Sequence, residues 1–201
     1  MSALLEPLQL SPERLALLES ISLKYGGHKK FEDGVCAMEI AAYVAGEDHS
    51  DQPSCVSKVI TSFMVAWNDA LPTDEERNRL LKPLIPIILG TRTSEADEMR
   101  RSWMALDWFV RTFTPAWLRL AGQTYPELLP FAESLSAASE IVDNDGLKAV
   151  RPITEAADSA ADSAAYSAAD SAALEVLNPV AVVLQESAQE LVRRMASVGR
   201  A

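Results

Sequence analysis

The chain has 201 residues, of which 48% are hydrophobic and 23% are charged. This composition is typical of a globular protein and excludes both a collagen-like fibre and a wholly disordered chain. The 29 acidic and 18 basic residues give a formal net charge of −11. Direct binding to nucleic acid phosphates, or to an anionic membrane through a basic surface, therefore has no electrostatic support.

The negative charge is concentrated in one part of the sequence. Residues 120–192 contain twelve acidic side chains but only two basic ones, Lys148 and Arg151, a net charge of −10. The remainder of the chain is close to neutral. Such a region is typical of a solvated surface that maintains solubility, and it also suits a basic protein partner or mimicry of nucleic acid.

The sequence indicates a cytoplasmic protein. Its first residues lack the basic start, apolar stretch and cleavage site of a signal peptide. The longest strongly apolar run, Leu84–Leu89, contains Pro86 and is far shorter than the roughly 20 residues of a membrane helix. Two cysteines, Cys36 and Cys55, are too few for a disulfide framework, so we expect free thiols.

Apolar residues recur at helical spacings nearly throughout, which predicts an all-α fold. In the first half we expect Ser11 to cap a helix that ends at Gly26-Gly27. Further expected features are a helix capped by Asp33 and stopped by Gly46, a core helix from Val56 to Trp67, a capping box of Thr73 and Glu76, a helix distorted by Pro83 and Pro86, and an amphipathic helix from Ser94 to Phe113.

Proline and glycine mark the elements of the second half. Pro115 is expected to start a short helix that ends at Gly122, and Pro126 and Pro130 to start another that reaches Val142. The tetrapeptide at residues 143–146, Asp-Asn-Asp-Gly, predicts a simple turn.

An internal repeat of Ala-Ala-Asp-Ser type occupies residues 156–173, in which ten of eighteen residues are alanine. Alanine favours helix, so we expect a helix capped by Thr154, followed by a last helix that starts at Asn178-Pro179. The period of four exceeds the 3.6 residues of a helical turn, so the alanine row winds around the helix. The small side chains suit close packing within the chain and, alternatively, a homo-oligomer.

These elements predict one all-α domain over residues 1–201, a compact bundle of about seven to nine helices. Residues 1–122 would form a helical body, and the acidic, Ala-rich residues 123–201 would pack on it through an Ala/Ser-rich C-terminal helical hairpin. The candidate interaction surface on the repeat consists of Asp158, Asp162, Tyr166 and Asp170, with Tyr166 as its one large anchor.

All cysteines and histidines of the chain lie in one 28-residue window: His28, Cys36, His49 and Cys55. These residue types ligate zinc, but gaps of eight, thirteen and six residues lack the close ligand pairs of structural zinc sites. Buried free cysteines are the simpler interpretation. A third alternative makes Cys36 a nucleophile, His49 its base and Asp51 the group that orients the base. No familiar catalytic motif is present, which favours a non-enzymatic protein without a cofactor.

Five segments carry a resemblance to a known group of proteins: Gly34–Glu39, Ala42–Glu47, Asp51–Cys55, Trp67–Asp69 and Leu84–Arg92. Together they resemble an uncharacterised helical protein family of actinobacteria and their bacteriophages, over about residues 26–92. In that family a histidine often stands where this chain has Gln52, a departure that weakens the zinc hypothesis. The resemblance implies a source and assigns no activity.

The favoured functional hypothesis is a non-enzymatic, cytoplasmic protein-protein interaction module. If it is encoded by a phage, it would act on a host factor in the host cytoplasm. One alternative is an acidic inhibitor that mimics nucleic acid, and another is a zinc-binding or cysteine-dependent enzyme that uses the cluster at residues 28–55.

Overall fold

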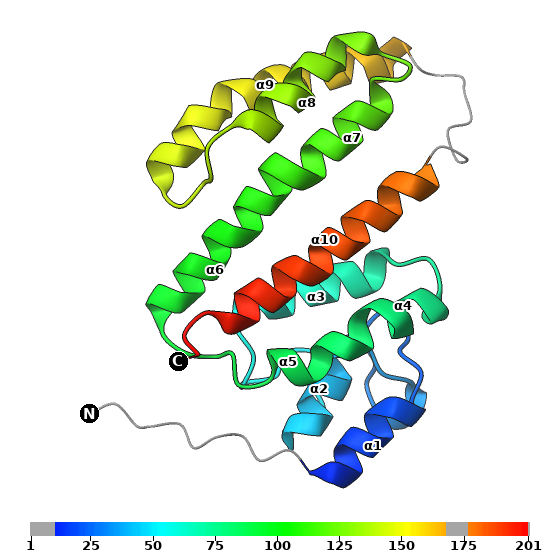
Figure 1. Ribbon diagram of the computed structural model, residues 1–201. Coiled ribbons are helices and arrows are strands. Elements are labelled where there is room, and N and C mark those ends of the chain that lie inside the picture. Colours follow the sequence, from blue (N-terminus) through cyan, green and yellow to red (C-terminus); the bar gives the residue numbers. More distant parts are fainter. Residues whose placement is uncertain (1–10, 168–176, 201) are drawn as a thin grey trace. The chain divides into compact units, whose positions relative to one another are not determined.

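The computed structural model describes residues 11–167 and 177–200, with side chains for residues 11–161 and 180–200 (Figure 1). This part of the chain is helical, and it contains no β-strand beyond an isolated bridge between Leu23 and Val35. Contiguous helical segments make eight helices in the described ranges. The all-α prediction is therefore confirmed, and the number lies within the predicted seven to nine.

Two compact units can be distinguished. Unit 1 consists of the residues up to Arg101 together with Val192–Ala201, and unit 2 consists of Ser102–Leu191. None of the described helices combines the length and the apolar character that crossing a membrane requires.

Unit 1 is built around a short buried helix, α2 (Ala37–Ala45), which packs against α1, α3 and α5. Seven of its nine residues are buried, and all of these except Glu39 are apolar, as suits a central helix. The other elements are α1 (Pro12–Ser20), η1 (Phe31–Asp33), α3 (Lys58–Ala70), α4 (Asp74–Leu81), η2 (Lys82–Leu84), α5 (Ile85–Ile88), the start of α6 (Glu95–Trp108) and the end of α10 (Leu177–Ser197).

The start of α2 differs from the prediction. Asp33 lies in the 3₁₀ turn η1, and Cys36 caps α2 instead: its Sγ accepts a hydrogen bond from the Glu39 N–H at 3.5 Å. Gly34 separates the two with φ of 125°, a conformation that side chains disfavour. The predicted stop at Gly46 is confirmed, because this residue is left-handed with φ of 83°.

The other predictions for unit 1 are confirmed in part. Thr73 Oγ accepts from the Glu76 N–H at 3.2 Å, and Pro83 lies in a 3₁₀ turn that joins α4 to α5. Ser94 caps α6, since its Oγ accepts from the Asp97 N–H at 3.2 Å. The first helix, in contrast, ends at Ser20 and not at Gly26, since Leu23 and Lys24 are extended beside Val35.

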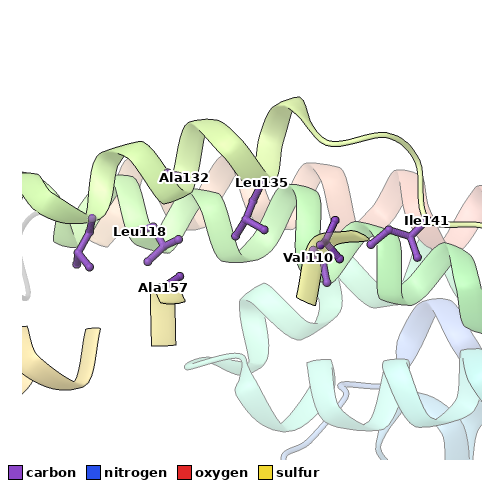
Figure 2. Packing of buried hydrophobic residues seen from close by; sticks show 8 residues of the cluster. Val110, Leu118, Ala132, Leu135, Ile141 and Ala157 are labelled. Atoms are coloured by element: carbon purple, nitrogen blue, oxygen red, sulfur yellow. The ribbon is translucent and has the colours of Figure 1, made fainter. Parts of the chain in front are cut away.

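Unit 2 has its core where α7 (Thr114–Ala121), α8 (Leu129–Ala137) and α9 (Asn144–Ser167) meet, with α8 in contact with both others. Figure 2 shows this core, which consists of Val110, Leu118, Leu128, Ala132, Leu135, Ile141, Val150 and Ala157. The short turn η4 (Pro126–Leu128) connects α7 to α8. Alanines at 132 and 157 let the backbones of α8 and α9 approach closely.

Pro115 does not start a new helix, contrary to the prediction. One helix continues from α6 into α7 through a π-helical turn, η3 (Phe109–Phe113), in which the Thr114 N–H bonds to the Phe109 carbonyl. Proline has no N–H, and its ring crowds the carbonyl of the residue four positions earlier, here Arg111. A widened turn accommodates that conflict without breaking the helix.

The predicted turn at residues 143–146 is the start of α9. Asp143 Oδ1 accepts from the N–H groups of Asp145 and Gly146 at 3.0 and 2.9 Å, as an N-cap does. The helix thus begins ten residues before Thr154 and carries Pro152 in its interior. The preceding helix ends at Ala137 instead of Val142. The predicted hairpin closes through residues 168–176, which lie outside the described residues, and it stays a prediction.

Candidate functional site

Glu39 is the centre of the Cys/His segment. Its side chain is 2% exposed and lies in the first turn of α2. Oε1 accepts from the His28 N–H at 2.5 Å, and Oε2 accepts from the Cys36 N–H at 2.7 Å. His28 Nδ1 lies 2.9 Å from Oε2. One carboxylate therefore holds the loop before α2 at two separate points.

His49 reaches the same carboxylate from the other end of α2. Its Nε2 lies 2.8 Å from the His28 carbonyl oxygen and 3.7 Å from Glu39 Oε1. We call His28, Cys36, Glu39 and His49 the Glu39 cluster. Three of the four predicted ligands are thus gathered, but around a carboxylate.

Cys55, the fourth predicted ligand, belongs to a different contact. The N–H groups of Ser54 and Cys55 bond to Glu47 at 2.5 and 2.9 Å. Over the residues that the structure describes, no group of three or more His, Cys, Asp or Glu side chains is placed to hold a metal ion. Zinc binding stays a prediction, without a preformed four-ligand geometry to support it.

Both thiols are held in the protonated form. Burial is the main reason that the pKa of Cys36 rises to about 12, with the Glu39 carboxylate adding to the rise. Burial and a hydrogen bond to Glu47 raise the pKa of Cys55 to about 11. Since the thiolate is the nucleophile, neither group is activated in this conformation.

Glu39 has the opposite tendency. Burial alone would raise its pKa, but hydrogen bonds from the N–H groups of His28 and Cys36, and the His28 ring, outweigh burial and lower the pKa. The sequence contains a signal for the role of Glu39 at the start of α2, since Cys36 and Glu39 have the spacing of a capping box.

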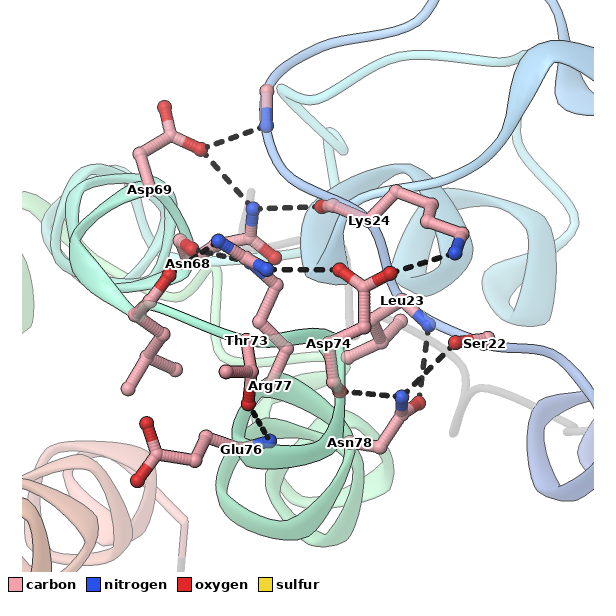
Figure 3. Close-up of polar contacts among 12 residues, drawn as sticks. Ser22, Leu23, Lys24, Asn68, Asp69, Thr73, Asp74, Glu76, Arg77 and Asn78 are labelled. Atoms are coloured by element: carbon pink, nitrogen blue, oxygen red, sulfur yellow. Dashed lines mark hydrogen bonds and ion pairs between the residues drawn. The ribbon is translucent and has the colours of Figure 1, made fainter.

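A second polar network joins the loop at residues 22–26 to α3 and α4 (Figure 3). Asp74 accepts from Lys24 Nζ at 2.6 Å and from Arg77 Nη1 at 2.8 Å, and these two bonds lower its pKa. The side-chain amide of buried Asn68 donates to the Lys24 backbone carbonyl at 3.0 Å. The backbone carbonyl of Asn68 accepts from Arg77 Nε at 2.8 Å. These groups are satisfied by one another, so the network positions the loop.

A row of aromatic side chains begins in the π-helical turn of unit 2 and continues into α7. We call Phe109, Phe113 and Trp117 the aromatic ridge. The ring centroids are 5.3 Å apart for the stacked pair Phe109 and Phe113, and 6.0 Å apart for Phe113 and Trp117. Phe109 is 52% exposed and Trp117 40%. The sequence predicted an amphipathic helix up to Phe113 and a separate short helix from Pro115, so it did not indicate this surface.

The side of the ridge is fixed by Trp108. Its indole Nε1 donates to Ser187 Oγ of α10 at 3.0 Å, and its ring lies 5.5 Å from that of Phe113. Buried Val110 and Leu118 face the core of unit 2 from the same helix. The ridge is therefore held between two anchored positions and is preorganised.

The sequence of unit 2 is strongly acidic, with thirteen acidic and four basic residues, a net charge of −9. The ridge helix, which is the part of the α6–η3–α7 helix that belongs to unit 2, carries two arginines, and both are paired. Arg111 pairs with Asp107 at 3.2 Å, and Arg119 pairs with Glu133 at 3.0 Å.

The predicted interaction surface on the alanine repeat is described only in part. Asp158 is exposed on α9, whereas Ala157 is buried and Ala160 and Ala161 pack against the core. This packing agrees with a role of the small residues within the chain. The side chains of Asp162 and Tyr166, and the whole of Asp170, lie outside the described residues.

Comparisons of this chain with protein-family profiles, with curated proteins and with solved structures find no match.

Proposed function

We propose that this protein is a non-enzymatic protein-protein interaction module whose contact surface is the aromatic ridge. The observation that carries the proposal is the exposure of Phe109 and Trp117 beside a stacked ring, on one helix of unit 2. Large aromatic side chains dominate the energetics of protein interfaces, and an exposed group of them is typical of binding surfaces.

Two further features support a binding role for the ridge. The π-helical turn places Phe109, Phe113 and Trp117 in a continuous row, and such turns are frequent at functional sites. The Trp108 bond to Ser187 restricts the ridge helix, which reduces the entropy lost when a partner binds. The family resemblance adds the proposal that the protein is phage-encoded and that its partner is a host protein.

The test is affinity capture with three forms of the full chain: wild type, the double variant F109S/W117S, and the control V142S. Val142 is also an exposed apolar residue of unit 2 at 58%, outside the ridge. We expect wild type and V142S to retain the same proteins and F109S/W117S to lose them, as read by quantitative mass spectrometry. Equal retention by all three forms would contradict the proposal.

A further inference from the structure

We propose that the segment recognised by the aromatic ridge is a basic amphipathic helix of a partner protein, with aliphatic or aromatic anchors and Lys or Arg at its flanks. This inference rests on the proposed function and specifies the chemistry of the partner.

The length and spacing of the ridge match the apolar face of a helix. Trp117 lies eight residue steps beyond Phe109, which is about 12 Å of helix. A partner helix that presents apolar side chains at every third or fourth position places two or three anchors over that length. Leu129, 39% exposed at the start of α8, lies against Gly122 near the end of α7 and is a further exposed apolar side chain of unit 2.

The charges beside the ridge select a cationic partner. Exposed Glu127 lies on η4, which packs on α7, and exposed Glu186 is adjacent to Ser187, the acceptor of the Trp108 indole. Both arginines of the ridge helix are already paired with carboxylates. Lys or Arg at the flanks of the partner would therefore meet the exposed carboxylates of Glu127 and Glu186.

The same charge disfavours the other occupants. A second copy would bring a second unit of charge −9 against the first, and like charges at an interface are costly. A nucleic acid or an anionic membrane would meet the same repulsion.

The test uses the full chain and three fluorescently labelled peptides of roughly 18 residues, about five helical turns each. The first has leucine on one helical face and lysine elsewhere, the second replaces lysine with glutamate, and the third replaces leucine with serine. Fluorescence anisotropy measures each affinity. We expect the affinity for the Leu/Lys peptide to be at least about tenfold higher than for the other two peptides.

Variants locate the binding surface. F109S/W117S should weaken binding of the Leu/Lys peptide about tenfold, whereas V142S should leave it within about twofold. Circular dichroism of each form shows whether it is folded. If the double variant is unfolded, the single variant W117S provides the test. Binding of the Ser/Lys or Leu/Glu peptide as tight as that of the Leu/Lys peptide would overturn the proposal. So would a Leu/Lys affinity that W117S and F109S/W117S leave unchanged.

Sedimentation of the same proteins addresses the second copy. A monomer is expected, and a dimer that F109S/W117S dissociates would overturn the proposal. Ridge-dependent capture of a protein without binding of the Leu/Lys peptide would overturn the chemistry of the partner and leave the interaction module intact.

Discussion

The conformation of the loop before α2 depends on the carboxylate of Glu39. It is 2% exposed and accepts from two backbone N–H groups, which have no other described acceptor in the cluster. Its lowered pKa means that folding favours the ionised form. Glu39 thus contributes stability that is present above the ordinary glutamate pKa of 4.5 and is lost as the pH falls through the lower pKa of the folded state.

We expect Glu39→Gln to lower the free energy of unfolding at pH 7 by about 3 kcal/mol, since the amide cannot accept from every donor that now surrounds the carboxylate. The variant should also lose part of the decline in stability that wild type shows as the pH falls below 4.5. Urea unfolding at a series of pH values measures both effects. Glu32→Gln, at an exposed glutamate of η1, is the control and should behave as wild type. An unchanged acid profile in E39Q would contradict the assignment.

The two thiols give a second prediction at this scale. With pKa values raised to about 12 for Cys36 and about 11 for Cys55, both stay protonated at pH 8. Iodoacetamide should therefore modify the native protein at least about tenfold more slowly than the unfolded chain. Mass spectrometry of the products reads each site separately. Rapid modification of native Cys36 would revive the nucleophile hypothesis, and failure of the unfolded chain to react would indicate a disulfide.

Among the elements, α9 carries a defect that a substitution can remove. Pro152 lies exposed inside this helix, where it has no N–H to donate to the carbonyl of Lys148. Pro152→Ala should raise the free energy of unfolding by about 2 kcal/mol, less than the full helical penalty because the unfolded chain also gains freedom. Thermal and urea unfolding measure the change. Pro126→Ala is the matched control: this proline is the first residue of η4, where no N–H is needed, so no gain is expected.

Some of the secondary-structure elements could be predicted from the sequence, and others could not. Helical periodicity and local signals predicted the all-α fold, the Gly46 stop, the Ser94 cap and a helix distorted at Pro83, because each depends on a few neighbouring residues. Two starts were missed for local reasons. Cysteine is not among the usual capping residues, so Cys36 was overlooked, and the aspartates of residues 143–146 suit a turn as well as a cap.

The candidate site could be predicted less well. Clustering of His28, Cys36 and His49 was correctly noticed, but Glu39 organises them, and no spacing rule for metal ligands includes that role. The exposure of Phe109 and Trp117 depends on which neighbours cover the helix and on the π-helical turn. Packing against segments distant in the sequence decides which residues are covered, so helical periodicity did not single out Phe109 and Trp117.

At the scale of the whole molecule, Arg101 ties the end of the chain into unit 1. It is 0% exposed and donates to the carbonyls of Met195 and Val198 at 2.9 and 2.7 Å, while Glu98 lies 3.2 Å away. Its guanidinium thus serves the last carbonyls of α10, which a helix leaves without partners. Arg200 adds bonds to the carbonyls of Ile87 and Leu89.

We expect Arg101→Ala to destabilise unit 1 by about 3 to 5 kcal/mol, since it removes the buried cation beside Glu98 and the side-chain donor to the carbonyls of Met195 and Val198. Amide hydrogen exchange should then increase over residues 192–200 first. Arg100→Ala, at the exposed neighbouring position, should leave exchange there as in wild type. Protection of residues 192–200 that persists in R101A would show that apolar packing alone holds them.

The two acceptors of Arg101 also set the order in which the protein can be assembled. They lie 94 and 97 residues away along the sequence, so the whole of unit 2 is synthesised between donor and acceptors. When the ribosome has just synthesised unit 2, the chain still lacks residues 192–201, which belong to unit 1. Closing so long a loop is entropically costly unless the intervening chain is already compact. Folding of unit 2 would shorten that loop, so the contacts of Arg101 with Met195 and Val198 are favoured once unit 2 is compact.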